Sequence, residues 1–330
     1  MSTENTDVTL SVVIPCYNEA ASLRRTAETL TAYLESADWN GDEPRTWEVI
    51  FVNDGSADET SQVLTDIAAN DGRFVAGGYG RNGGQGKALQ WGFARCRGKW
   101  IICFDADLDY APDHLERFMK LAAETDADCI VASPFIDGGG MQNVPGSRVF
   151  MSAAMNWFLS MAIDRGISTW TCNLRLWRAE KLRQIPMVSQ DKDLLPEMLV
   201  KARHLEMKLV ECPATLIWGE AKTSRAGMGK GVLFTAAKSL EHFAIGLAEN
   251  PLRFLLAPAV PLAFLTVVMC LWMLVAPGAL VGRVVLTLLA ADVLVGLWGL
   301  LLLMLGARRA DRERTVYFSR LPANREPGDD

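Results

Sequence analysis

The stretch that decides the fold is WIICFDADLD, residues 100–109. Its first half is apolar and rich in β-branched and aromatic side chains, which predicts a fully buried β-strand. Asp105, Asp107 and Asp109 follow at alternate positions. The stretch therefore predicts a core strand that carries carboxylates at its carboxyl end.

Short β-rich runs and helical patterns alternate on both sides of this stretch. Strands are predicted at residues 10–14, 47–52, 74–76, 129–132 and 209–210, and helices at residues 21–34, 59–69 and 86–94. This alternation predicts an α/β fold in which a largely parallel sheet is flanked by helices. Ligands bind such sheets beyond the carboxyl ends of the strands, so the residues that follow each strand form the candidate site.

Acidic side chains gather at these strand ends. Glu19 and Asp54 follow the first two strands, and Asp105 and Asp107 follow the stretch quoted above. Four acids on one rim would repel one another unless a cation or hydrogen-bond donors were bound there. Oxygen ligands suit Mg²⁺ or Mn²⁺, with water and substrate phosphate completing the shell. The alternative is that the aspartates cap the next helix, for which Asp113 is better placed.

Residues 77–87, GGYGRNGGQGK, form a glycine-rich connection. The glycines match a dinucleotide fingerprint, but they follow the third predicted strand instead of the first, and no clean helix opens inside them. A Walker-type phosphate loop fails because Arg81 and Ala88 stand where it needs glycine and a hydroxyl residue. Two interpretations stay open: a loop whose amides and Lys87 approach a diphosphate, or an ordinary flexible connection.

Two apolar segments, residues 254–275 and 284–305, lie near the C-terminus. At about 1.5 Å per residue each reaches roughly 33 Å, enough to cross a hydrocarbon core of roughly 30 Å. A turn-forming link predicts a hairpin, and the arginines at its outer ends place both ends in the cytoplasm. Asp292 in the second segment is either a functional or subunit-pairing group or a residue facing a partner helix. The alternative for the pair is two buried helices of a soluble protein.

The composition limits the classes of protein to which the chain can belong. The chain has 330 residues, 50 % hydrophobic and 22 % charged, enough for one large domain and an appendage. Its net charge of −6 argues against non-specific nucleic-acid binding. Seven cysteines without a Cys-x-x-Cys pair predict reduced core thiols, and residues 1–7 lack the features of a signal peptide. We therefore expect the first domain to stay in the cytoplasm.

Ordered motifs resemble the family 2 glycosyltransferases of GT-A fold. They are VVIPCYNE at residues 12–19, VNDGSAD at 52–58, NGGQGKA at 82–88 and FDADLD at 104–109. Ser147-Arg148 and CNLR at residues 172–175, with the two-helix anchor, resemble the subgroup of dolichol-phosphate mannose synthases and bacterial polyprenyl-phosphate glycosyltransferases. The resemblance implies a Rossmann-like domain with a mixed, mostly parallel sheet.

The resemblance also implies how the chain is divided. The expected parts are a GT-A catalytic domain over residues 1–230, an interfacial amphipathic helix over 231–253, two transmembrane helices over 254–306 and a basic, flexible cytoplasmic tail over 307–330. The protein would then be a multi-pass protein of the inner membrane with its catalytic domain in the cytoplasm. Its membrane helices could pair with a second copy. Residues 150–163 could also lie in the membrane interface, with ordinary core packing as an equal alternative.

Site residues follow from the matching positions. The UDP- or GDP-linked donor sugar would be bound by Pro15, Tyr17, Glu19, Asp54, Gln85, Lys87 and Asp105. The metal, Mg²⁺ or Mn²⁺, would be held by Asp105, Asp107 and Asp109, and the acceptor phosphate by Arg148, Arg175, Lys222 and Arg225. Of these, Asp105, Asp107, Arg148 and Arg175 are the expected catalytic residues. Two segments depart from the family pattern: residues 172–175, usually of Ser-Gly-Phe-Arg type, and residues 217–222, which lack an expected arginine and serine.

The expected reaction is an inverting, metal-dependent transfer of a sugar from a nucleotide sugar to a polyprenyl phosphate. An alternative acceptor is a hydroxyl of a membrane glycolipid or glycan, with Asp191 or Asp193 as candidate bases. An alternative of another class is a catalytically silent membrane scaffold that binds nucleotide sugars.

Overall fold

The computed structural model describes residues 8–39, 45–164 and 166–219, together with Val284, Leu289, Val293 and Gly296. The chain divides into two compact units, Met1–Ser160 with Arg165–Ala236, and Met161–Asp164 with Ala237–Asp330. Nearly all described residues belong to the first unit. The expected transmembrane hairpin, interfacial helix and tail lie outside the described residues, apart from isolated helical positions in the hairpin. Within the described part, no helix combines the length and apolar character needed to cross a bilayer.

The first unit alternates strands and helices. In chain order the elements are β1 (Leu10–Cys16), α1 (Leu23–Ser36), β2 (Trp47–Asp54), α2 (Thr60–Asn70), β3 (Phe74–Tyr79), α3 (Gln85–Phe93), β4 (Trp100–Cys103), α4 (His114–Thr125), β5 (Cys129–Ser133), β6 (Gly140–Gln142), α5 (Gly146–Ala162), β7 (Arg175–Arg178), α6 (Ala179–Leu182), α7 (Leu194–His204), β8 (Leu209–Pro213) and β9 (Thr215–Ile217). Each strand predicted from the sequence is present, most of them longer than predicted.

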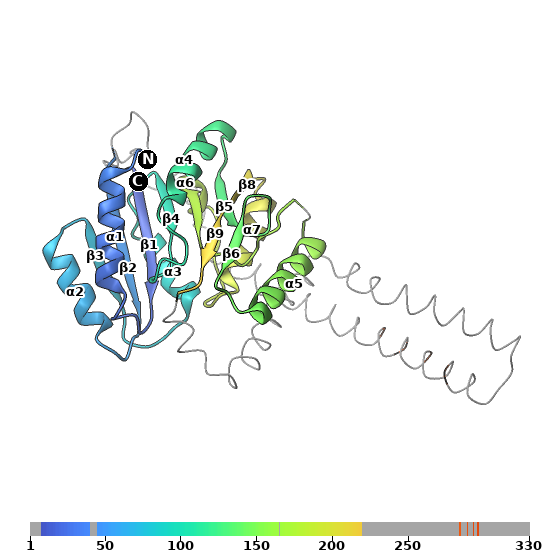
Figure 1. Cartoon of the computed structure of the whole chain (residues 1–330), viewed down its shortest axis with the longest axis horizontal. Helices are drawn as coiled ribbons and strands as arrows, with labels where there is room; N and C mark the ends of the chain where they lie inside the picture. Colours follow the sequence, from blue (N-terminus) through green and yellow to red (C-terminus); the bar gives the residue numbers. More distant parts are fainter. Residues whose placement is uncertain are drawn as a thin grey trace, which may run out of the picture. The chain divides into compact units, whose positions relative to one another are not determined.

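Seven strands form one sheet in the order β3-β2-β1-β4-β7-β5-β8, and β6 pairs with β9 in a second, two-stranded sheet. Figure 1 shows the blue strands β1 to β3 on one side of the large sheet and the green and yellow strands toward the other. Only β7 runs antiparallel to its neighbours, β4 and β5, among the described pairings of this sheet. The expected mixed, mostly parallel sheet is therefore confirmed.

Helices cover both faces of the sheet because its strands are apolar on both sides. On one face the buried residues of α1, among them Leu23 and Leu30, join Val12 and Ile14 of β1 in a single core. On the other face α3 lies so close to the sheet that a Cβ on Gly92 would stand 2.5 Å from a Val13 methyl carbon. The alternation of side chains along β1 thus sends Val12 and Ile14 to one face of the sheet and Val13 to the other.

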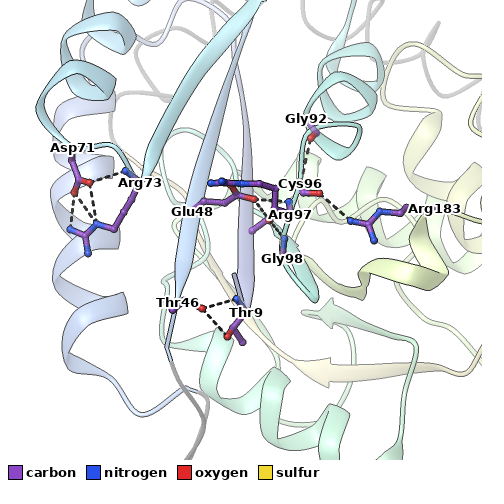
Figure 2. Close-up of polar contacts among 11 residues, drawn as sticks. Thr9, Thr46, Glu48, Asp71, Arg73, Gly92, Cys96, Arg97, Gly98 and Arg183 are labelled. Atoms are coloured by element: carbon purple, nitrogen blue, oxygen red, sulfur yellow. Dashed lines mark hydrogen bonds and ion pairs between the residues drawn. The ribbon is translucent and has the colours of Figure 1, made fainter. Parts of the chain in front are cut away.

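Polar contacts tie down the amino-terminal ends of the strands (Figure 2). Glu48, near the start of β2, is 1 % exposed and accepts hydrogen bonds from Ser11 Oγ at 2.6 Å and from the Arg97 backbone amide and Nε at 2.7 and 2.8 Å. The Thr9 backbone amide donates to Thr46 at the same end. The buried Glu48 carboxylate is thus hydrogen-bonded by residues near the amino-terminal ends of the strands. The candidate ligand site is at the opposite, carboxyl ends of the strands.

Candidate active site at the carboxyl edge of the sheet

The topology selects one position along the carboxyl edge of the sheet. From β1 the chain moves outward through β2 to β3, and then returns to place β4 on the other side of β1. The loops after β1 and β4 consequently diverge, and a crevice opens at such a switch point in α/β sheets. Tyr17 to Glu19 follow β1, and Asp105 to Asp109 follow β4. The acidic motifs expected to share a rim therefore flank the switch point.

The loop after β4 is a tight turn with a fixed backbone. The Leu108 amide donates to the Asp105 carbonyl at 3.0 Å, and Leu108 adopts a left-handed φ of 52°. Buried Thr26 of α1 donates its hydroxyl to the Ala106 carbonyl at 2.6 Å, and the Ile217 amide donates to the Asp109 carbonyl at 2.8 Å. Contacts from α1 and β9 thus hold the aspartates in place before any ligand binds.

The expected metal ligands are only partly assembled. The described residues contain no group of three acidic, histidine or cysteine side chains placed to hold one metal ion, so Asp105, Asp107 and Asp109 do not form a complete cage by themselves. Mg²⁺ needs no such cage, because it binds through one or two carboxylates and keeps water and phosphate oxygens as its other ligands. Asp105 and Asp107 are half-buried at the switch point. Their carboxylates offer only oxygen atoms as metal ligands, which suits a hard cation of that kind. Asp109 is almost fully buried.

Asp54 organises the glycine-rich loop. This carboxylate is 4 % exposed; its Oδ1 accepts from the Gly83 amide at 2.7 Å, and its Oδ2 accepts from the Gly84 amide at 3.1 Å and from Asn82 Nδ2 at 3.1 Å. Gly55 allows this close approach, since a Cβ there would meet the Arg81 backbone at 2.3 Å. The loop is therefore anchored at the rim and is not an ordinary flexible connection.

Two predicted donor-binding residues extend from this loop. Gln85 begins α3, and Lys87 places its ammonium group 4.2 Å from the centre of the Tyr79 ring. Burial and the adjacent Asp54 carboxylate raise the pKa of the Tyr79 phenol, so this group stays protonated and neutral near pH 7. The amino-terminal end of α3 and Lys87 thus bring positive potential to the acidic rim, as a diphosphate site requires.

A segment far along the chain supports the glycine loop from its other side. The Lys87 amide donates to the Gln190 carbonyl at 2.8 Å, and Gln90 Nε2 donates to the Ser189 carbonyl at 2.7 Å. Buried Glu197 of α7 accepts from the Val188 and Ser189 amides, each at 2.8 Å. Sequence reasoning gave Glu197 no role in the site, although an acid inside the apolar run LLPEMLV, residues 194–200, is a signal that the sequence shows.

The loops after β1 and β2 clamp each other. The Asn18 backbone amide donates to Ser56 Oγ at 3.0 Å, and Asn18 Oδ1 accepts from the Ala57 backbone amide at 2.8 Å. The Glu19 backbone amide donates to Thr60 Oγ1 at 2.9 Å. Pro15 stands one residue before the end of β1, and Tyr17 is 49 % exposed beyond it. An exposed aromatic ring on a clamped loop suits stacking with a nucleotide base.

Arg175 is not placed on the rim. It is 1 % exposed, and its guanidinium donates to the carbonyls of Leu195 and Trp170. Burial lowers the pKa of this guanidinium. Because β7 is inserted between β4 and β5, the first side chain of β7 enters the core and not the solvent. This position does not support the expected direct contact of Arg175 with an acceptor phosphate.

Arg148 is exposed on the first turn of α5 and connects to the rim through β9. Its guanidinium carbon lies 4.9 Å from the centre of the Trp218 ring. Trp218 follows Ile217, whose amide donates to the Asp109 carbonyl. The end of β9 therefore links the aspartate turn to Arg148. Lys222 and Arg225, the other expected acceptor ligands, lie outside the described residues.

Comparison with known proteins agrees with this geometry. The family model for glycosyl transferase family 2 matches residues 11–174. A dolichyl-phosphate beta-glucosyltransferase from Trichomonas vaginalis is 31 % identical over 223 residues, covering 66 % of this chain and 68 % of that protein. An undecaprenyl-phosphate 4-deoxy-4-formamido-L-arabinose transferase from Pseudomonas fluorescens is 40 % identical over 115 residues, covering 34 % of this chain and 32 % of that protein.

The fold also recurs among solved structures. Glucosyl-3-phosphoglycerate synthase from Mycobacterium tuberculosis, in complex with Mn²⁺, UDP-glucose and phosphoglyceric acid, matches with a TM-score of 0.52 at 15 % identity, covering 74 % of this chain and 80 % of that chain. This likeness shows a GT-A-like α/β fold. With the family model and the curated relatives, it leads to one conclusion: the chain is a glycosyltransferase and belongs to glycosyl transferase family 2.

Proposed function

We propose that the protein transfers a sugar from a nucleotide sugar to a polyprenyl phosphate, with inversion at the anomeric carbon. The curated relatives named above support the acceptor class, since their names specify dolichyl and undecaprenyl phosphates. The observation that carries the proposal is the Asp105–Leu108 turn at the switch point of the sheet, with Arg148 reached from it through β9.

The donor occupies the crevice between the loops after β1 and β4 in this proposal. Tyr17 stacks on the base, while the glycine loop and Lys87 face the diphosphate. Asp105 and Asp107 would hold Mg²⁺ or Mn²⁺, and Asp109 fixes the turn through its backbone carbonyl. A bound cation of this type would stabilise the negative charge of the departing nucleoside diphosphate. The anchored backbones of the turn and the glycine loop keep the donor groups oriented during the displacement.

The acceptor phosphate binds to Arg148, with Lys222 and Arg225 as further proposed ligands. A phosphate monoester has a second pKa of about 6, so the attacking oxygen is already largely ionised near pH 7 and no strong general base is needed. The outer surface of α5 supports a lipid acceptor: Phe150 is 74 % exposed and Trp157 is 66 % exposed, seven residues apart on one helix face. Exposed aromatic side chains on α5, the helix that also carries Arg148, suit an acceptor with an apolar tail.

The membrane parts complete the proposal. Residues 254–306 form two membrane-spanning helices, residues 231–253 lie in the interface, and the catalytic domain faces the cytoplasm. This arrangement brings the site to the lipid headgroups. It rests on the sequence alone, because the structure describes only isolated positions of these residues.

The test is a transfer assay with the purified full-length protein. Labelled nucleotide sugars, each with Mn²⁺ or Mg²⁺, are offered with membrane lipid that contains polyprenyl phosphate. We expect label in the organic extract as a phosphate-linked product that mild acid releases. Label only in alkali-labile glycerolipid would select transfer to a hydroxyl, for which Asp191 beside the glycine loop is the candidate base. No transfer with any donor would favour the silent scaffold.

A further inference from the structure

Asn173 lies against the aspartate turn, two residues before the start of β7. Its Nδ2 donates a hydrogen bond to Asp105 Oδ1 at 3.1 Å. The side chain is 6 % exposed, and its flanking residues Cys172 and Leu174 are buried as well. The Ala132 amide donates to the Leu174 carbonyl at 3.1 Å, which fixes the backbone at this point. Asn173 therefore cannot swing into solvent to satisfy its polar atoms.

The orientation of the Asn173 amide follows from its partner. An ionised carboxylate only accepts hydrogen bonds, so the NH₂ group of Asn173 must face Asp105. The carbonyl oxygen must then point away from Asp105. Within the described part of the chain this buried Oδ1 has no hydrogen-bond partner.

A buried acceptor without a donor is unfavourable, and such groups in folded proteins are explained by a ligand, a water or a functional role. In a nucleotide sugar the anomeric carbon is bonded to the oxygen of the terminal phosphate. If Asp105 and Asp107 hold the metal of the diphosphate, the sugar begins one bond beyond that phosphate. The hydroxyl groups of that sugar are hydrogen-bond donors, and they would then lie close to Asp105 and to its partner Asn173.

We propose that Asn173 is a donor-binding residue that links the metal site to the sugar. Its NH₂ group holds Asp105 in position, and its Oδ1 accepts a hydrogen bond from a hydroxyl of the sugar to be transferred. This inference rests on the proposed function and adds to it a residue that discriminates the sugar-bearing nucleotide from the bare nucleotide.

The test measures binding and not turnover. Dissociation constants of the full-length protein are measured by calorimetry with Mn²⁺ for UDP-glucose, UDP-N-acetylglucosamine and GDP-mannose, and for UDP and GDP alone. The quantity of interest is the ratio of nucleotide to nucleotide-sugar dissociation constants for the best-bound donor. We expect Asn173→Ala to lower this ratio about three- to tenfold, as loss of one neutral hydrogen bond implies. Cys172→Ala, at the neighbouring buried position, should retain the wild-type ratio.

Other outcomes overturn the inference in distinguishable ways. If Asn173→Ala weakens UDP and UDP-sugar equally, Oδ1 acts on the metal or the fold and not on the sugar. Three further outcomes reject the inference and leave the proposed function standing. The ratio of dissociation constants could be unchanged in Asn173→Ala, or it could fall equally in Cys172→Ala. The wild-type protein could also bind sugar-bearing and bare nucleotides equally. A wild-type protein that binds no donor of the panel rejects the proposed function and the inference together.

Discussion

At the residue scale, Asp54 shows how one side chain can shape the glycine loop of the candidate site. Its carboxylate accepts from the Gly83 and Gly84 amides and from Asn82. Asp54→Ala removes the only charge in this arrangement and leaves the loop amides without their acceptor. We expect the free energy of unfolding to fall by about 1–3 kcal/mol and donor affinity to fall about tenfold. Chemical denaturation and donor binding measure these effects. Asp66→Ala, an exposed ion-pair partner on α2, is the control and should change both little.

Asp107 provides a different prediction, because its expected partner is a cation. Asp107→Asn should lower sugar transfer by about two to three orders of magnitude, since the metal loses a charged ligand. The unfolding temperature should stay the same or rise, because an acid leaves a crowded rim. EDTA should abolish transfer by the wild-type protein and Mn²⁺ or Mg²⁺ should restore it. Transfer at wild-type rates in Asp107→Asn, or in EDTA, would rule out the metal site.

The site was predictable from sequence where residues follow a strand directly. Asp54 and Asp105 were placed at the rim by their position after buried strands, and the structure has them there. The burial of Arg175 was not predicted, because it depends on β7 being inserted between two other strands, which no local pattern reveals. Its contact with the acceptor phosphate stays a prediction. Asn173 had no recognisable role for the same reason, since its contact with Asp105 joins positions far apart in the chain.

At the element scale, the backbone of the glycine loop is held by contacts on two sides. Gly84 has a φ of 93°, and a Cβ there would stand 2.6 Å from the Gln190 carbonyl oxygen. Gly84→Ala should therefore shift the loop away from residues 188–191 and reduce donor affinity, at a cost in stability of about 1–3 kcal/mol. Gly80→Ala is the matched control, because no atom lies within 4 Å of a Cβ at Gly80. Equal donor affinity in the two variants would show that the loop does not contact the donor.

Elements with a strong local pattern were predicted well, and those that depend on distant partners were not. The buried strands β1, β2 and β4 have apolar runs that the sequence shows directly. Among the described strands, β6 and β9 pair with each other alone, and their three-residue lengths leave no periodicity to detect. The support of the glycine loop by residues 188–190 involves Glu197 of α7, whose hydrogen bonds to the Val188 and Ser189 amides follow from tertiary packing alone.

At the scale of the whole molecule, the described cysteines behave as core residues. Cys16, Cys96, Cys103, Cys129, Cys172 and Cys212 are all buried and unpaired with one another. Burial raises the pKa of each thiol, to about 11 at Cys172 and about 12 at Cys96. Because the thiolate is the reactive form, a raised pKa lowers reactivity at any pH below it. Folded protein should react only slowly with a thiol reagent at pH 8 and quickly in denaturant; fast labelling of several thiols in the native state would contradict the described core.

These protected thiols make the proposed membrane topology testable by a single introduced cysteine. Ala279 lies in the link between the two apolar segments, and Ser319 lies beyond the arginines that follow the second. The positive-inside bias places Ala279 on the outer side of the membrane and Ser319 in the cytoplasm. In intact cells a membrane-impermeant maleimide should label Ala279→Cys but not Ser319→Cys, and both should react after the membrane is opened.

The wild-type protein, with Cys270 predicted inside the first span, gives the background labelling. Labelling of Ser319→Cys alone in intact cells would reverse the orientation, whereas protein washed from the membrane by alkaline carbonate would show that residues 254–306 do not anchor it.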